Sequence, residues 1–254
     1  MLDYDRHSEG ENGLIVLLHS ISLDRSVFDD LVPYLSPDFD VVSVDLPGHG
    51  TSPGHEDMTI ESMADEVAEL IREQLAEPAL VVGLSMGGCV AQALAVRHPD
   101  LVRGLGLLDT TCWYGAEAPQ NWEARAQKGK DEGMAALVDF QVARWFTPEF
   151  NESNPSVGER LAEVWREADV DSYVAACRAM GAVDLRDEIG AIAVPTTIIV
   201  GADDMATDVT HAEAMQQRIS GATLHVIPDC AHLSAAEHPE TVAGILKADL
   251  FTRV

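Results

Sequence analysis

The sequence is poor in basic side chains. Its 254 residues include only 16 lysines and arginines against 43 aspartates and glutamates, which gives a formal net charge of −27. A surface this acidic repels the phosphates of nucleic acids, so we do not expect nucleic acid as a partner. The charge alone names no ligand, because an acidic surface is also typical of a well-solvated globular protein.

Long apolar runs are also absent. No stretch approaches the roughly 20 consecutive apolar residues that a membrane-spanning helix needs, so we expect no membrane contact. The first five residues, Met1 to Asp5, have neither the basic start nor the apolar core of a secretory signal peptide. We therefore expect a cytoplasmic protein.

Cysteines are few and far apart. They show no Cys-x-x-Cys spacing and stand at Cys89, Cys112, Cys177 and Cys230. This spacing favours reduced, buried thiols over a metal site or a disulfide framework. Internal repeats and low-complexity tracts are missing as well, and the sequence leaves the oligomeric state open. The length fits one α/β domain with an insertion.

The most informative stretch that is present runs Val81-Val82-Gly83-Leu84-Ser85-Met86-Gly87-Gly88. A β-branched run leads into a serine flanked by glycines, and a helical pattern follows. In a Gly-x-Ser-x-Gly turn the serine occupies a sharp, strained corner, and the glycines remove side chains that would collide there. The following helix directs its N–H groups at negative charge that forms near the serine. We interpret Ser85 as a nucleophile; the alternative is a glycine-rich turn with a spectator serine.

Strands and helices alternate on both sides of this turn. Apolar runs predict strands at residues 14–18, 41–44, 79–82, 105–109, 195–200 and 223–227. Helical spacing predicts helices at residues 28–35, 60–75 (with Thr59 as N-cap), 86–97, 211–219 and 239–250. This alternation predicts an α/β fold with a mostly parallel central sheet flanked by helices.

The alternation stops after the strand that ends near Asp109. From about residue 111 to residue 190 the sequence shows helical patterns, such as residues 134–146 and 157–180, which we expect to be broken at Pro119, Pro148 and Pro155. We therefore predict a core at residues 1–110 and 192–254, with a helical cap at residues 111–191 that covers the serine as a lid. All four tryptophans lie in the cap, and we expect three of them in its interior.

A serine hydroxyl needs a base, and the base needs a third group that orients it. Of nine histidines, only His232 follows the last predicted strand, on a loop at the same sheet edge as Ser85. For the acid we choose Asp204, three residues after Gly201, with Asp203 as the next candidate and Asp109 as the third. We expect a structural role for His49, which lies in a glycine-rich turn.

The negative oxygen of an acyl-transfer intermediate needs two N–H donors. Met86, the residue after the nucleophile, supplies one. The other comes from the loop after the first long strand, from Ile21 or else from Ser20.

These residues carry a family resemblance. Residues 83–88, 45–50 and 201–204, together with Ala231-His232, resemble the α/β-hydrolase superfamily over nearly the whole chain. Within it, the chain is similar to 3-oxoadipate enol-lactonases through residues 144–148, residues 175–186 and Ser20. Two positions depart from that pattern: Pro47 stands where such enzymes tend to have arginine, and His19 where they tend to have asparagine.

The resemblance implies attack of Ser85 on a lactone or ester carbonyl with His232 as base, and release of an acyl-enzyme by water. It implies a small-molecule substrate, no cofactor or metal, and a place in aromatic-compound catabolism. Ser20, Arg144, Trp145 and Arg186 are the expected substrate-binding residues, and either arginine could hold a carboxylate. The alternatives are a general carboxylesterase, a carbon–carbon bond hydrolase and a non-catalytic ligand receptor on the same scaffold.

Overall fold

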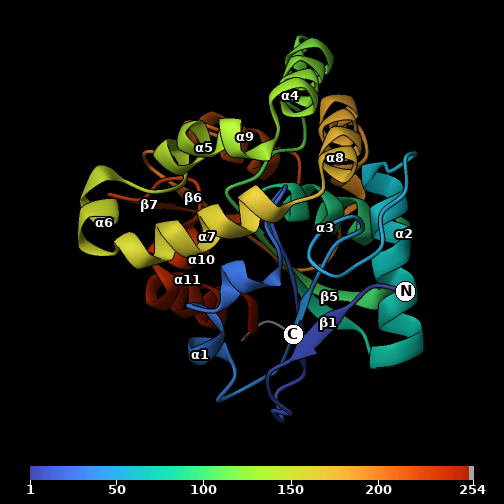
Figure 1. Ribbon diagram of the computed structural model, residues 1–254. Helices are drawn as coiled ribbons and strands as arrows, with labels where there is room; N and C mark the ends of the chain where they lie inside the picture. Colours follow the sequence, from blue (N-terminus) through green and yellow to red (C-terminus); the bar gives the residue numbers. More distant parts are fainter. Residues whose placement is uncertain (252–254) are drawn as a thin grey trace.

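Seven strands form one sheet in the order β1-β3-β2-β4-β5-β6-β7 in the computed structural model, which describes residues 1–251 (Figure 1). The strands are β1 (Tyr4–Arg6), β2 (Leu14–Leu18), β3 (Asp40–Val44), β4 (Ala79–Leu84), β5 (Val102–Leu108), β6 (Thr196–Gly201) and β7 (Thr223–Ile227). Neighbouring strands are parallel, except that β1 pairs antiparallel with β3. Every residue of β2, β3, β4 and β6 is buried, which explains the continuous apolar runs of β2 and β4.

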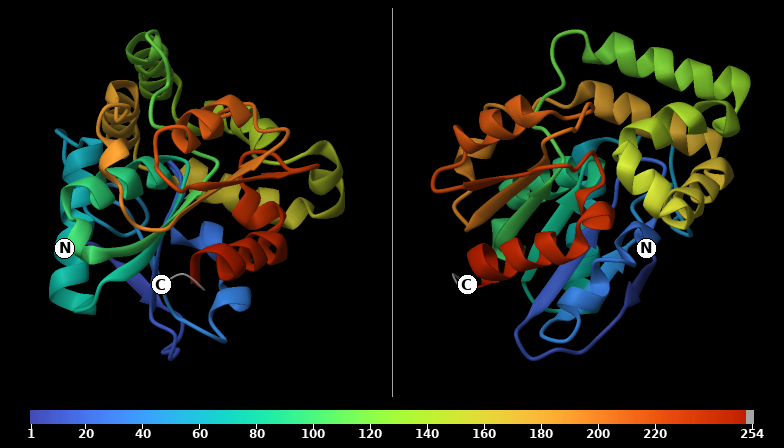
Figure 2. Two further views of the ribbon diagram at one scale, coloured as in Figure 1. Left: turned by 180° about the vertical axis from the view of Figure 1, so that it is seen from behind. Right: turned by 90° about the vertical axis from the view of Figure 1, so that its left-hand side faces the viewer.

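Helices cover both faces of this sheet. On one face α2 (Ile60–Leu70) packs against α3 (Met86–Arg97), and on the other α1 (Val32–Leu35) packs against α11 (Pro239–Leu246) (Figures 1 and 2). The remaining helices of the core are α9 (Val209–Gln216), α10 (Ser234–Glu237), the π-helical turns η2 (Ile71–Leu75) and η6 (Lys247–Phe251), and the 3-10 turns η1 (Arg25–Phe28), η3 (Pro99–Leu101) and η5 (Ile189–Ala191). The side chain of Thr59 accepts the N–H of Ser62, which confirms the predicted start of α2.

The insert between β5 and β6 is helical, as predicted, and lies over one end of the sheet (Figure 2). It consists of α4 (Ala118–Glu132), η4 (Met134–Leu137), α5 (Val138–Trp145), α6 (Pro148–Ser153), α7 (Pro155–Glu167) and α8 (Val170–Ala182). The sheet order and this insert confirm the predicted fold class. The cap boundaries at residues 111 and 191 stay a prediction.

The insert is interrupted at Pro148 and Pro155 as expected, because α5 ends at Trp145 and α6 at Ser153. Each of the three prolines also starts a helix: Pro119, Pro148 and Pro155 occupy one of the first two positions, where the missing N–H costs nothing. One expectation was wrong in detail. The pattern at residues 157–180 is two helices, because the side chain of Asp169 accepts the N–H of Ser172 and caps a new helix.

Several short or polar elements, among them β1, α4 and α10, are absent from the sequence-based prediction. The strand β1 has three residues and is exposed at two of them, so its run is too short and too polar to identify. The helix α4 is polar on most of its surface and lies along α8, burying only Ala118, Trp122, Ala126 and Gly129. Such a narrow buried stripe gives a weak helical pattern.

The described part of the chain agrees with two further expectations. All four cysteines are free and buried. Among residues 1–251, no helix combines the length and the apolar character needed to cross a bilayer.

Candidate active site

Ser85 stands at a strained corner between β4 and α3. Its backbone has φ 54° and ψ −113°, a region that residues with a side chain rarely adopt. A Cβ atom on Gly83 would lie 2.2 Å from the carbonyl oxygen of Gly87, and one on Gly87 would lie 2.1 Å from that of Leu18. The corner can therefore form only with glycine at both positions.

The structure brings the predicted serine, histidine and aspartate together. The Nε2 atom of His232 lies 3.0 Å from Oγ of Ser85, and Nδ1 lies 2.9 Å from Oδ2 of Asp204. All three residues are buried. Because the carboxylate accepts the Nδ1 proton, Nε2 is left to accept the proton of the serine hydroxyl.

Asp204 is held as a carboxylate by several donors. Its Oδ1 accepts the N–H groups of Ala206 (2.7 Å) and Thr207 (3.0 Å), and Oδ2 accepts the Thr207 hydroxyl at 2.8 Å. Burial raises the pKa of this carboxyl, but the charge and hydrogen bond of His232, together with these N–H groups, lower it below the usual range. The neighbouring Asp203 is exposed, so it is Asp204 that contacts the imidazole.

The imidazole is correspondingly easy to protonate. Burial lowers the pKa of His232, but the charge and hydrogen bond of Asp204 outweigh it, and Asp109 adds to the effect while Arg144 opposes it. The net pKa lies above the usual value of about 6.5. An ionised Asp204 therefore favours the imidazolium that forms when the serine gives up its proton.

The two N–H groups expected to hold the oxyanion belong to Met86 and Ile21. Met86 is the first residue of α3, and Ile21 lies just after β2. Within residues 1–251 neither N–H donates a hydrogen bond to another protein group, whereas the N–H of Gly87 is used by the His19 carbonyl at 3.0 Å. Ser20, the alternative to Ile21, lines the same cavity.

The cavity around Ser85 has a volume of about 180 Å³ and is lined largely by residues of the helical insert. Trp122, Trp145 and Trp165 line it, so three of the four tryptophans reach the site where only Trp145 was expected. Tyr114 lines it too, in edge contact with Trp122 at 5.4 Å between ring centroids. Larger grooves of about 950 and 840 Å³ do not include Ser85.

Comparison with known proteins agrees with this geometry. Residues 13–239 match the family described as "alpha/beta hydrolase fold". The chain belongs to the α/β-hydrolase family. The 3-oxoadipate enol-lactonase 1 of Acinetobacter baylyi is 30% identical over 226 residues, 89% of this chain and 84% of that protein. A pimeloyl-[acyl-carrier protein] methyl ester esterase of Neisseria meningitidis is 32% identical over 243 residues, 92% of this chain and 75% of that protein.

A solved structure shows the same likeness. The crystal structure of the enol-lactonase from Burkholderia xenovorans LB400 superposes with a TM-score of 0.93 at 34% identity, covering 98% of this chain and 96% of that one. The described fold and the predicted family resemblance are thereby confirmed.

Two arginines of this α/β hydrolase line the serine cavity. Arg144 donates to the Met205 carbonyl at 2.8 Å, and Arg125 lies over the Trp122 ring at 4.3 Å from its centroid. In the described part of the chain, neither guanidinium has a carboxylate within 4.0 Å. Burial and the nearby Arg125 lower the pKa of Arg144, as expected for a cation that lacks a counter-ion.

The sequence did not point to Arg125, because it lies on the weakly patterned α4. The structure does not bring the other expected arginine, Arg186, to this cavity. Its guanidinium binds Asp184 with two hydrogen bonds of 2.7 and 2.6 Å and stacks on Trp113 at 3.7 Å, in a separate pocket of about 430 Å³.

Two buried histidines near the hydrolase site have structural partners. His19 accepts the N–H of Leu46 at 2.9 Å through Nε2, and Nδ1 of His49 lies 2.9 Å from the Pro47 carbonyl. Burial lowers the pKa of His19 to about 4 and that of His49 to about 3, so both are neutral at pH 7. These contacts agree with the expected structural role of His49.

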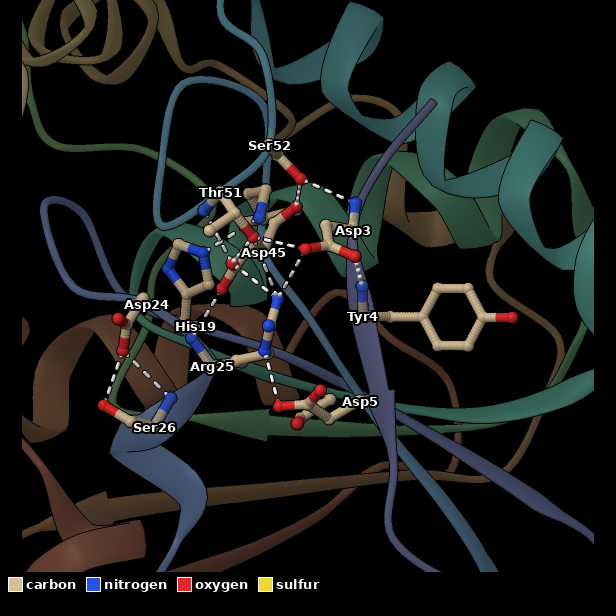
Figure 3. Close-up of polar contacts among 12 residues, drawn as sticks. Asp3, Tyr4, Asp5, His19, Asp24, Arg25, Ser26, Asp45, Thr51 and Ser52 are labelled. Carbon is tan, nitrogen blue, oxygen red and sulfur yellow. Dashed lines mark hydrogen bonds and ion pairs between the residues drawn. The ribbon is translucent and has the colours of Figure 1, made fainter.

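Arg25 anchors the loop that follows β2 (Figure 3). It binds Asp5 of β1 at 2.7 Å and Asp45, at the end of β3, at 2.7 Å, and its backbone N–H donates to Asp45 at 2.9 Å. Asp45 also accepts the N–H of Thr51 at 2.9 Å. These contacts tie the loop that carries Ser20 and Ile21 to β1 and to the end of β3.

Candidate metal ligands are not gathered in this hydrolase: among residues 1–251, no group of three or more His, Cys, Asp or Glu side chains is arranged around a common point. The expectation of chemistry without metal or cofactor stays a prediction.

Proposed function

We propose that this α/β hydrolase cleaves a compact, carboxylate-bearing lactone or ester through an acyl-enzyme on Ser85, most closely in the manner of a 3-oxoadipate enol-lactonase. The main support is one arrangement: a serine, a histidine and an aspartate joined at 3.0 and 2.9 Å, beside a cavity lined by two arginines that have no carboxylate partner among residues 1–251. Relatives that are 30% and 32% identical to this chain are an enol-lactonase and a methyl ester esterase.

The first half of the reaction forms the acyl-enzyme. His232 takes the Ser85 proton through Nε2 as Oγ attacks the carbonyl carbon. The carbonyl oxygen becomes negative and is held by the N–H groups of Met86 and Ile21, each contributing about 3 kcal/mol to the lowering of the barrier. The carbon–oxygen bond of the leaving group then breaks, and the imidazolium returns the proton to the departing oxygen. An enol released in this way tautomerises to a ketone.

The second half regenerates the enzyme. Water enters beside His232, which takes one of its protons as the water oxygen attacks the acyl carbon. The second tetrahedral intermediate collapses with the proton passing to Oγ of Ser85, and the acid product leaves. Asp204 stays ionised throughout and stabilises the imidazolium in both halves.

The cavity indicates the substrate class. A volume of about 180 Å³ holds about six water molecules at about 30 Å³ each, which suits a single small ring with a short substituent. The tryptophan rings offer flat apolar surface to such a ring. Arg125 and Arg144 would hold a carboxylate on the substituent, in a protein whose net charge of −27 otherwise repels anions.

A carboxylesterase for small esters is the second candidate, because the methyl ester esterases among the relatives resemble the chain as closely as the lactonases do. A carbon–carbon bond hydrolase and a non-catalytic receptor use the same scaffold but have no specific support from the cavity.

The test is a substrate comparison on purified protein. Rates with 3-oxoadipate enol-lactone, an uncharged lactone of similar size, short p-nitrophenyl esters and a vinylogous diketo acid would be measured for the wild type and for Ser85→Ala. The proposal predicts the highest kcat/KM for the anionic lactone and loss of turnover in the variant. Activity limited to the neutral esters would favour the carboxylesterase, and cleavage of the diketo acid alone would favour the carbon–carbon hydrolase. Absence of turnover with every substrate would favour the receptor.

A further inference from the structure

The backbone around His232 is fixed from three directions. The N–H of Ala231 donates to Glu237 at 2.7 Å, that of Leu233 donates to the Trp145 carbonyl at 3.0 Å, and that of Ser234 donates to Asp109 at 2.9 Å. Two of these acceptors are buried carboxyl groups that the reaction described above does not use.

Asp109 differs from Glu237 because it binds the backbone of both segments that carry the acid–base pair. Its Oδ2 binds the segment that carries His232, and its Oδ1 accepts the N–H of Gly201 at 3.0 Å, three residues before Asp204. One carboxyl group therefore joins the ends of β5 and β6 to the loop that follows β7.

The position of Asp109 is strained and closed to solvent. Its φ is 45°, in the left-handed region that a residue with a side chain adopts only when its surroundings enforce it. The side chain is fully buried, and the backbone N–H donates to the Ile199 carbonyl at 2.9 Å. The fold thus maintains an acidic side chain at a place where a carboxylate is costly.

The groups that face Asp109 come from two loops. Asp204 follows β6, while His232 and the thiol of Cys230 follow β7. Burial, and then the charge of Asp204, raise the pKa of Asp109 to about 7, and His232 opposes this. The carboxyl group and the imidazole consequently influence each other in the pH range in which the base must work.

We propose that Asp109 is a positioning residue for this hydrolase: it holds the His232 segment against β6, and its negative charge stabilises the imidazolium that forms when Ser85 loses its proton. The proposal rests on the proposed function. The sequence offered Asp109 only as a third choice for the acid that contacts the imidazole, and that contact belongs to Asp204.

The direct test is Asp109→Asn, which keeps the shape of the side chain, removes its charge and leaves one backbone N–H facing an amide NH₂. We expect kcat to fall about tenfold while KM stays within twofold. The acidic limb of the pH profile of kcat/KM should move to lower pH, because loss of a nearby negative charge lowers the pKa of His232. An unchanged acidic limb would refute the proposal. So would a loss of activity that is fully explained by a smaller fraction of folded protein.

Asp45→Asn is the matched control. Asp45 is a buried aspartate that also accepts two backbone N–H groups, from Arg25 and Thr51, but at the end of β3 and outside the serine cavity. Its replacement should lower the melting temperature without moving the acidic limb. An equal shift of the acidic limb in both variants would show that the loss of any buried carboxylate lowers the pKa of His232. That result would refute a specific role for Asp109.

A measurement on the wild-type protein covers the case in which Asp109→Asn does not fold. Proton and nitrogen NMR of the His232 ring should show two coupled ionisations, since burial and the charge of Asp204 raise the pKa of Asp109 to about 7 and the charge of Asp204 raises that of the ring. A single ionisation would refute the proposal. This titration needs no substrate, so it remains decisive even if Ser85→Ala keeps its activity and the proposed function fails.

Discussion

Removal of either cavity arginine should weaken turnover of anionic substrates selectively. Arg144 lies on α5 and Arg125 on α4, and both reach the cavity that contains Ser85. Since neither guanidinium has a carboxylate partner among residues 1–251, replacing it by alanine leaves no protein anion unpaired. The lost interaction is then mainly that with the substrate, which makes the variants informative.

The magnitude follows from the environment of the guanidinium. A hydrogen bond to a charged group contributes about 1.5–3 kcal/mol. Arg144 is half-buried, so solvent screens part of the interaction and the lower half of that range applies. A loss of about 1.5–2 kcal/mol corresponds to a decrease of about 10- to 30-fold in kcat/KM. If both arginines bind one carboxylate, the double variant should lose less than the product of the single effects.

The assay compares 3-oxoadipate enol-lactone with an uncharged lactone of similar size, for the wild type, Arg125→Ala, Arg144→Ala and Arg186→Ala. Arg186 is the control because it pairs with Asp184 in a separate pocket. The first two variants should lose activity on the anionic lactone and keep it, within about threefold, on the neutral one. An equal loss on both lactones, or the same selective loss in Arg186→Ala, would refute the assignment of the anion site.

Further changes test the strained corner at Ser85, the acid Asp204 and the base His232. Gly87→Ala should abolish activity and lower the melting temperature, since its Cβ would lie 2.1 Å from the Leu18 carbonyl oxygen; a folded, active variant would contradict the described corner. Asp204→Asn should lower kcat about 10³- to 10⁴-fold, whereas Asp203→Asn should stay near the wild type, and the reverse result would reassign the acid. In the wild type, kcat/KM should fall as the pH drops through the raised pKa of His232, so an acidic limb centred below pH 6.5 would be inconsistent with the ion pair.

Much of the fold could be read from the sequence because the central strands are buried on both faces. The runs at β2 and β4 are apolar without interruption, and the glycines around Ser85 mark the turn after β4. Parallel strands place their carboxyl ends at one sheet edge, so Ser85 and His232 could be brought together from chain order alone. The distances between them needed coordinates, and these place Asp204, the acid chosen from the sequence, rather than Asp203 against the imidazole.

What the sequence did not predict lies mainly in the insert. Helix α4 buries only a narrow stripe, and the packing of the insert, rather than any local pattern, brings Arg125 and Tyr114 to the serine cavity. Arg186 was misplaced for the same reason, because its nearest anion, Asp184, binds it away from the cavity. The second role of Asp109 was also hidden, since its two N–H partners are distant in the chain.

The most direct measurement is rapid-quench mass spectrometry of the purified protein mixed with a short p-nitrophenyl ester. The account predicts a transient acyl group on the peptide that contains Ser85, formed and lost at rates that match turnover. Turnover without such an adduct, or an adduct on another residue with Ser85→Ala fully active, would contradict it.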